Sequence, residues 1–462
     1  MSNKQTNFHY ILAIAFFLLT SCSKNWLDEK PDSKLAVATT LNDFQALNDG
    51  PLLYVTNALG EIGGDNYYIS DLSFQYLYNF DIAEYIWAPN GYGVSSESDW
   101  EILYKNIFSS NTVLDGLSNV DVSSGSATQY DQVKGTALYF RGYDYYELAQ
   151  TFCKSYDSAT AQSDPGIPLM LHADVNERPG RGTVAQLYGQ LFSDLLQAAA
   201  LLPNADQLYK TRPNKAAAFA MLARAYLSIG SYRLAELYAD SALAIKNVLL
   251  DYNTLSANGF QSMPGFNDNP EVIAYSTIFA GDDLSPYGSL IDSTLYNLYD
   301  SSDLRQTMFF TDAMNYIGIP GQVFYGTYNG SNNGNFFTAP AVDELYLIRA
   351  ECEARNGQVT ASRNDLNFLL QYRYVTGKFT PVNLSNTDSL LAKILLERRK
   401  ELVMRATRWT DLRRLNKDNR FATTLTRNAN GTVYTLSPNS NLYVYPIPDD
   451  EITVSNIAQN PR

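Results

Sequence analysis

The chain has 462 residues, of which 45% are hydrophobic and 18% charged, a composition typical of a folded globular protein rather than a disordered one. Its formal net charge of −14 disfavours nucleic-acid binding, because that binding depends on Lys and Arg neutralising phosphates. Only two histidines occur, His9 and His172, which disfavours a zinc or di-iron site built from several histidines.

The N-terminus is typical of a lipoprotein signal. Lys4 supplies positive charge, residues 11–19 are apolar, and small residues stand directly before Cys22, as in the bacterial lipobox. The apolar run is shorter than the roughly 18 residues that a membrane-spanning helix needs. We predict a signal peptide over residues 1–21, lipidation at Cys22, and a polar tether over residues 22–40. The alternative is an ordinary secretory signal with an incidental cysteine.

The folded part, residues 41–462, begins with a loop-rich segment. Residues 50–100 are rich in Gly, Asn, Asp, Tyr and Phe, contain turn dipeptides such as Asn90-Gly91, and have few periodic apolar runs. Residues 252–340 have the same character. Because so many aromatic residues disfavour disorder, we expect long ordered loops or short hairpins in both segments.

Helical periodicity dominates residues 130–250. Apolar residues recur every three or four positions in residues 133–152 and 184–202. In residues 215–245, alanines fall at the spacing of a tetratricopeptide repeat and Gly230 stands at the expected turn, which predicts a helical hairpin. One hairpin cannot bury its own apolar face, so several must stack.

A second helical region is predicted at residues 341–405. Ala350 and Gly357 repeat the seven-residue spacing of the first hairpin, and a further helix is expected around residues 390–404, with Asn386 as a candidate cap. The predicted fold class is therefore mainly α: a tetratricopeptide-like scaffold of helical hairpins with long irregular loops and a few short strands.

Several motifs occur in an order typical of one known family. They are Trp26-Leu27-Asp28 after Cys22, Gly166-Ile167-Pro168-Leu169, Arg181-Gly182-Thr183-Val184, Glu397-Arg398-Arg399, Arg408-Trp409-Thr410-Asp411-Leu412-Arg413 and Tyr445-Pro446-Ile447-Pro448. Through them the chain resembles the SusD/RagB family of Bacteroidetes-type outer-membrane lipoproteins along almost its whole mature length.

The resemblance implies a function without catalysis. It implies a lipid-anchored protein of the outer membrane that faces the exterior, binds oligosaccharide or polysaccharide and delivers it to a SusC-like TonB-dependent transporter. It also implies that residues 50–100 and 252–340 supply the ligand-binding loops. No cofactor is expected. Calcium would need oxygen ligands such as those of Asp282 and Asp283, whose spacing is not that of a calcium loop.

Candidate ligand-binding residues follow from the chemistry of sugars. Their C–H faces stack on flat aromatic rings, and their hydroxyls need amide or carboxylate partners. Both kinds of group occur together in the two loop segments. The candidates are Asp65, Asn66, Tyr67, Trp87, Asn90, Tyr325 and Tyr328. The opposing interpretation is that most of these rings pack the loops against the helices.

Two other function classes stay open. An exported glycoside hydrolase would use a pair of carboxylates, and a helical-repeat scaffold would bind only protein; the cargo of a binder could also be peptide instead of glycan. Cys153 and Cys352 have no metal or redox spacing, and we interpret them as two buried thiols although an exported protein could join them in a disulfide.

Overall fold

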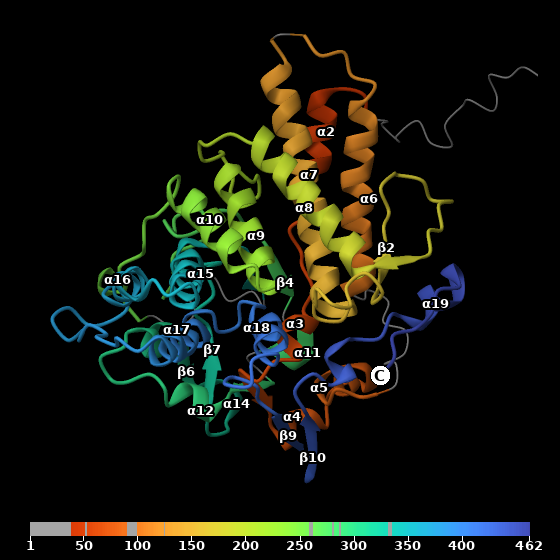
Figure 1. Cartoon of the computed structure of the whole chain (residues 1–462). Coiled ribbons are helices and arrows are strands. Elements are labelled where there is room, and N and C mark those ends of the chain that lie inside the picture. Colours follow the sequence, from red (N-terminus) through yellow and green to blue (C-terminus); the bar gives the residue numbers. More distant parts are fainter. Residues whose placement is uncertain are drawn as a thin grey trace, which may run out of the picture. The chain divides into compact units, whose positions relative to one another are not determined.

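Helices dominate the part of the chain that the structure describes (Figure 1). The computed structural model describes residues 38–50, 53–89, 99–123, 125–257, 262–279, 281–285, 288–330 and 335–462. The predicted signal peptide, Cys22 and Asn90 lie outside these residues. The chain from Leu41 to Arg462 forms one compact unit, and the mainly α fold class is confirmed.

Three long helices pack together at the N-terminal side of this unit. They are α6 (Asp99–Leu117), α7 (Ala127–Phe152) and α8 (Val184–Leu201). The short helix α2 (Leu41–Asn48) packs against α6 and α7. Gly142 lets α7 approach α8 closely, because a Cβ there would lie only 2.9 Å from the Leu195 side chain. The middle of α7 is buried almost all round, so this helix forms the centre of the group.

The predicted hairpin is confirmed as α9 (Lys215–Ser228) and α10 (Tyr232–Leu243), which turn at Gly230 with a φ of +73°. Their contact consists largely of fully buried alanines. The second predicted hairpin is α15 (Val342–Arg355) and α16 (Val359–Leu370), which packs on the first through α10 and α15. The hairpins therefore stack, as their apolar faces require.

The C-terminal helices complete the stack. The helix expected around residues 390–404 is α17 (Thr387–Glu401), and its predicted cap is present because the Asn386 side chain accepts a hydrogen bond from the Ser389 N–H at 2.9 Å. It ends at Glu401, earlier than expected. A right-handed helix could not continue through Met404, because the φ of that residue is +57°. The helix α18 (Arg408–Leu415) follows.

The two loop-rich segments contain short helices and strands. The short helices of the described residues are α3 (Leu59–Ile62), α4 (Asp71–Phe74), α5 (Asn79–Tyr85), η2 (Tyr252–Thr254), α11 (Gly281–Leu284), α12 (Ser293–Tyr296), α13 (Arg305–Phe309) and α14 (Met314–Ile317); η3 (Asn441–Tyr443) and α19 (Asp449–Ser455) lie near the C-terminus.

All strand pairs found in the described residues are antiparallel and two-stranded. They are β1 (Tyr67–Ile69) with β5 (Ser289–Ile291), β2 (Pro165–Pro168) with β3 (Arg181–Thr183), β4 (Thr277–Phe279) with β8 (Asn335–Phe337), β6 (Phe310–Asp312) with β7 (Gln322–Phe324), and β9 (Leu425–Ala429) with β10 (Thr432–Leu436).

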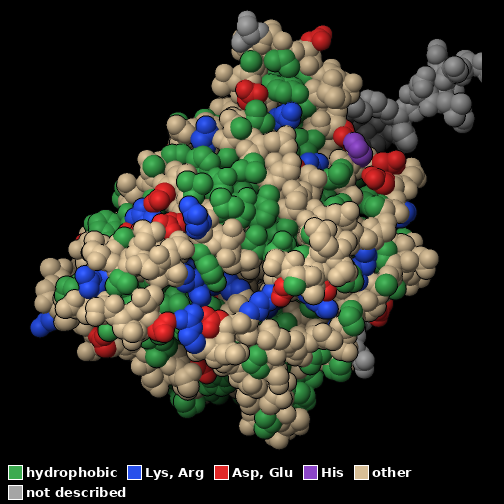
Figure 2. All heavy atoms as spheres, viewed as in Figure 1, with side chains coloured by type: hydrophobic (Ala, Val, Ile, Leu, Met, Phe, Trp, Pro, Cys, Tyr) green, Lys and Arg blue, Asp and Glu red, His purple; other side chains and the backbone are tan. Residues whose placement is uncertain are grey.

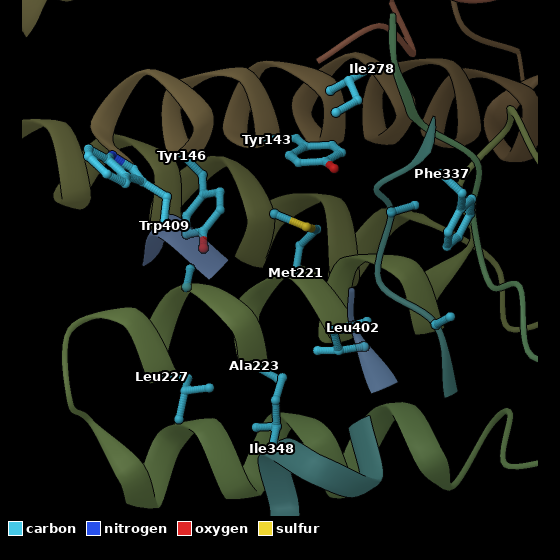
Figure 3. Packing of buried hydrophobic residues seen from close by; sticks show 14 of the residues in the cluster. Tyr143, Tyr146, Met221, Ala223, Leu227, Ile278, Phe337, Ile348, Leu402 and Trp409 are labelled. Carbon is cyan, nitrogen blue, oxygen red and sulfur yellow. The ribbon is translucent and has the colours of Figure 1, made fainter. Parts of the chain in front are cut away.

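A shared apolar core joins the helical stack to these small strand pairs. Figure 3 shows Tyr143 and Tyr146 of α7 above Met221 of α9, with Trp409 of α18 next to Tyr146. Phe337 of β8 belongs to the same cluster. The aromatic residues of the loop segments therefore contribute to the core as well as to the surface.

Buried ion pairs hold the second loop segment on the C-terminal helices. The Arg305 side chain is fully buried and bonds Asp303 at 2.7 Å, Glu397 at 2.6 Å and Glu401 at 3.0 Å. Arg373, also fully buried, bonds Glu401 at 2.7 Å. Because breaking one member would leave an unpaired buried charge, the network fixes where the loop segment lies.

Half-buried aromatic rings stack across neighbouring helices. Phe192 of α8 lies 4.1 Å from Tyr226 of α9 with 9° between the ring planes, and Tyr226 lies 5.5 Å from Tyr238 of α10. Figure 2 shows apolar side chains gathered over these helices. Because the rings stack on one another, they stabilise the helix contacts rather than present free faces.

Candidate ligand-binding face

The two loop-rich segments meet through a strand pair. In β1 and β5, Tyr68 lies opposite Leu290 and Ile69 opposite Ser289. This pairing brings the chain around α4, in the first segment, next to α11 and α14, in the second (Figure 1). Two segments more than two hundred residues apart in sequence thereby form one surface.

An open groove of about 430 Å³ lies between them. Ser73, Tyr76 and Leu77 line one side, and Ser285 lines the other. The described lining residues not yet named are Leu72, Gly288, Ile317 and Ile319. The lining thus combines an aromatic ring, aliphatic side chains and hydroxyls, which is the combination that a sugar's C–H faces and hydroxyl rim require.

The floor of the groove is supported from below. A small apolar cluster of Leu290, Ala313 and Val323 is buried, and Ile317 and Ile319 pack on it. The groove is therefore held in shape by its own minor core rather than by the ligand.

Two exposed tyrosines lie near the turn between α4 and α5, and one of them, Tyr76, lines the groove. The Tyr76 side chain is 77% exposed and that of Tyr78 is 63% exposed, values far above those of most rings in the chain. Tyr78 and Phe80 are parallel, with 5.6 Å between ring centres and 4° between planes. Tyr78 therefore stacks on Phe80, and Tyr76 is the exposed ring that lines the groove.

Local hydrogen bonds fix the backbone that carries these rings. The Ser70 hydroxyl accepts from the Ser73 N–H at 3.1 Å and caps α4. The carboxylate of Asp81 accepts from the Tyr78 N–H at 3.1 Å at the start of α5. These caps set the turn between the two short helices, where Tyr76 lies.

The expectation that Trp87 and Tyr67 are exposed platforms is wrong, because both rings are buried, at 2% and 3% exposure. The guanidinium of Arg427, from β9, lies 4.5 Å from the Trp87 ring and 5.4 Å from the Tyr67 ring. The Trp87 Nε1–H donates to the Gly63 carbonyl at 3.1 Å. An arginine of the same chain occupies the ring faces that a sugar would need.

Asp65 and Asn66 are also engaged internally. The Asp65 carboxylate accepts two hydrogen bonds from Arg408, at 2.6 and 3.1 Å, and pairs with Arg399 at 3.2 Å. Burial opposes ionisation, but these arginines outweigh it and hold the pKa of Asp65 well below its usual range. Asn66, 1% exposed, donates to the Glu61 carboxylate at 2.9 Å.

Tyr325 and Tyr328 are core residues as well, which corrects the expectation that they lie exposed on a loop. They are 4% and 1% exposed. The Tyr325 hydroxyl donates to the Thr307 carbonyl at 2.7 Å, and the Tyr328 hydroxyl donates to the Glu271 carboxylate at 2.7 Å. Asn90 lies outside the described residues.

The groove lies between the two predicted loop segments, but none of the predicted site residues that the structure describes lines it. Tyr76, the exposed ring that lines the groove, was missed, although it lies within residues 50–100. The one available signal is that polar Gln75 and Asn79 flank Tyr76 and Tyr78, whereas Tyr67 is the first residue of β1. Counting rings without their polar neighbours cannot separate the exposed from the buried.

Other candidate groups have structural roles. Cys153 and Cys352 are buried free thiols, which confirms our interpretation, and burial raises the pKa of Cys153 to about 12. The exposed His172 lies 3.1 Å from the Asp115 carboxylate. The described residues hold no group of three or more His, Cys, Asp or Glu suited to a metal ion. No helix among them is both long and apolar enough to cross a membrane.

Comparisons with known proteins place this surface in a family context. Residues 25–227 match the family model described as "Starch-binding associating with outer membrane", and residues 326–462 match the one described as "SusD family". No curated protein sequence matches the chain significantly.

The fold is similar to several solved structures. A SusD superfamily protein of Bacteroides thetaiotaomicron has a TM-score of 0.73 and 22% identity, covering 92% of this chain and 100% of its own. A SusD-like carbohydrate binding protein of Bacteroides vulgatus has a TM-score of 0.67 and 20% identity, covering 91% and 97%. A SusD-like carbohydrate binding protein of Bacteroides fragilis has a TM-score of 0.66 and 16% identity, covering 92% and 99%. At these identities the likeness concerns the fold.

Proposed function

Since this chain belongs to the SusD/RagB family, we propose that it is a cell-surface lipoprotein that binds an oligosaccharide or polysaccharide and delivers it unchanged to a TonB-dependent outer-membrane transporter. The observation that carries the proposal is the groove between α4 and α14, which combines the exposed Tyr76 ring with aliphatic side chains and hydroxyls. Similar proteins are described as carbohydrate binding, which supports a glycan as the ligand.

Binding in this groove would combine stacking with hydrogen bonds to hydroxyls. The Tyr76 ring offers a face for the apolar side of a sugar, and the hydroxyls of Ser73 and Ser285 can both donate and accept. Because the site is open and shallow, we expect a micromolar rather than a nanomolar dissociation constant. This corresponds to a binding free energy of about −8 kcal/mol or weaker. Modest affinity suits a protein that must release its cargo.

Anchoring and delivery form the second part of the proposal. Lipidation at Cys22 would hold the protein at the outer membrane, which agrees with the family description of an association with that membrane. Confinement to the membrane raises the effective concentration of the protein near a SusC-like transporter. Transfer then needs no bond-making step, only opening and closing of the contact between the two proteins.

The test uses the mature lipoprotein in detergent on gels containing starch or another polysaccharide. We expect retarded migration in at least one gel, no new reducing ends after incubation, and copurification of a β-barrel transporter from outer membranes. Tyr76→Ala should weaken retardation about tenfold, the loss of one stacked ring, while Tyr209→Ala, which removes a 52% exposed ring elsewhere, should not.

Each alternative function has its own outcome in the same experiment. New reducing ends would show the glycoside hydrolase and overturn a function without catalysis. Copurification of a transporter without retention of any polysaccharide would favour the protein-binding scaffold. If the protein retained peptides in place of glycans, and Tyr76→Ala lost that retention, the proposed site would be correct and the proposed cargo would be wrong.

A further inference from the structure

A second groove lies away from the one described above, between α6, α19 and the loop that follows β2. It consists of two adjoining hollows of about 550 and 240 Å³, and both are lined by Trp100, Tyr104 and Glu451. None of its described lining residues belongs to the groove between α4 and α14. The combined volume of the two hollows is in the range of small-molecule binding sites.

One wall of this second groove is an aromatic strip on α6. Trp100, Tyr104 and Phe108 are spaced four residues apart, so their side chains lie one above another on one face of the helix. The Trp100 and Tyr104 ring centres are 4.8 Å apart, and Phe108 is 40% exposed. The strip therefore continues from a buried ring to an exposed one.

The first two rings of the strip are held in place from behind. The Tyr104 hydroxyl donates to the Pro168 carbonyl at 2.7 Å, and the Trp100 ring meets the Phe152 ring edge-on at 5.1 Å. Rings fixed in this way lose little conformational freedom when a ligand stacks on them. The wall is thus preorganised.

The remaining lining is rich in hydrogen-bond acceptors. Asp450 and Glu451 of α19 line the larger hollow, and Glu177 lines the smaller one. The Oε2 atom of Glu177 is shielded from solvent and has no hydrogen-bond partner in the described part of the chain. Three carboxylates therefore line the two hollows together with the aromatic strip. Each keeps at least one oxygen with no hydrogen bond in the described part of the chain, since Asp450 accepts from the Glu451 N–H and Glu451 from the Ser455 hydroxyl through one oxygen only.

The second groove is lined, among the described residues, by four carboxylates, of Glu101, Glu177, Asp450 and Glu451, and by two cations, Lys105 and Arg178, so its lining is negative overall. Lys105 pairs with Glu101 of the same helix at 2.8 Å. Arg178 donates to two backbone carbonyls of its own loop, at 2.7 and 2.8 Å. The lining consequently favours a ligand that brings hydroxyl donors and repels one that brings negative charge.

From this arrangement we propose that the second groove is an additional subsite for a neutral oligosaccharide, which stacks its rings on the α6 strip and donates hydroxyl hydrogen bonds to Glu177, Asp450 and Glu451. This inference rests on the proposed glycan-binding function and deepens it. A chain that carries uronate or sulfate groups is excluded from the subsite by the same carboxylates. With two subsites, one polysaccharide can be held at two points of the protein surface, which raises its apparent affinity.

The test is calorimetric titration of the full mature protein with maltoheptaose, cellohexaose, xylohexaose, mannohexaose and hexagalacturonate. For at least one neutral chain we expect two binding events in the wild type. Phe108→Ala should weaken one event about tenfold and leave the other unchanged, and Tyr76→Ala should do the reverse. Leu196→Ala removes a side chain of the same 40% exposure on α8 and is the matched control.

Three results would overturn the inference. If Phe108→Ala titrates like the wild type while Tyr76→Ala loses its binding, the second subsite is wrong and the proposed function stands. If hexagalacturonate binds in a manner that Phe108→Ala abolishes, the assigned ligand class is wrong. If no saccharide binds to the wild type, both the subsite and the proposed function fail.

Discussion

The guanidinium carbon of Arg427 lies 4.5 Å from the centre of the Trp87 ring, inside the protein. Tyr85 flanks the same guanidinium at 4.0 Å. The guanidinium also donates to backbone carbonyls of Ile62 at 2.6 Å and of Tyr85 and Gly64. One arginine from β9 therefore satisfies the carbonyls of the first loop segment and packs against its rings, which explains why a segment with so little regular structure is ordered there.

Replacing that arginine should unfold the first loop segment. Arg427→Ala leaves several buried carbonyls without donors and a gap between rings, so we expect the free energy of unfolding to fall by about 3 to 5 kcal/mol. Urea denaturation measures the change. Val433→Ala, at a 61% exposed position on the neighbouring β10, should cost about 0.5 kcal/mol or less. Equal effects of the two substitutions would contradict the structural role of Arg427.

Trp87 and Tyr76 should respond in opposite ways to the same substitution. Trp87→Ala empties a buried site and should lower the free energy of unfolding by about 3 to 5 kcal/mol, with saccharide affinity unchanged in the protein that stays folded. Tyr76→Ala removes an exposed ring, so stability should change by about 0.5 kcal/mol or less while affinity falls about tenfold. Denaturation and calorimetry on both variants separate the two effects.

The reverse outcome would restore the original expectation. If Trp87→Ala abolished saccharide binding at unchanged stability, the ring would have to leave Arg427 and reach the ligand. Tyr76→Phe serves as the conservative variant, because it keeps the ring face and should retain most of the affinity.

The helical scaffold could be predicted because its signals are local. Alanines at the contact between α9 and α10 are needed wherever two helices approach closely, and Gly230 adopts a positive φ that favours glycine. The end of α17 could not be predicted in the same way. Met404 and Ala406 adopt positive φ values of 57° and 54°, and no local rule assigns that conformation to these residue types.

The exposed rings could not be separated from the core rings by sequence because burial is set by distant residues. Trp87 and Tyr76 occur in one loop segment with similar composition. What distinguishes them is Arg427, more than three hundred residues later, which covers the Trp87 ring. Composition therefore located the loop segments, whereas the exposed positions required the three-dimensional arrangement.

Stability should depend on pH through Glu147, a buried residue of α7. Burial raises its pKa from 4.5 to about 8, although Arg224 opposes the shift. Because the folded state holds this proton more tightly than the unfolded state does, the group destabilises the fold progressively as pH rises from 4.5 to about 8. Glu147→Gln mimics the protonated form and avoids this loss.

Glu147→Gln should therefore gain stability relative to the wild type by roughly 1.4 kcal/mol per unit of pH between pH 4.5 and about 8. Below and above this range the difference in stability should be constant. Urea denaturation at a series of pH values gives the difference. Leu196→Ala, at an exposed position of α8, changes no titratable group and is the control. A Glu147→Gln difference that does not change with pH would mean that the carboxyl is not shielded as described.

The contact between α7 and α8 depends on a buried ion pair, in which Arg141 donates to both oxygens of Asp194 at 2.8 and 2.7 Å. Asp194→Ala leaves the guanidinium buried without its partner charge and should lower the free energy of unfolding by about 3 to 5 kcal/mol. The double variant Arg141→Met with Asp194→Leu removes both charges and fills the space, so it should cost less than the single substitution. A double-mutant cycle by urea denaturation measures the coupling. The double variant also loses the hydrogen bond from Arg141 to Asn111 of α6, at 2.9 Å. A double variant no more stable than Asp194→Ala would contradict the role of the ion pair in the helix contact.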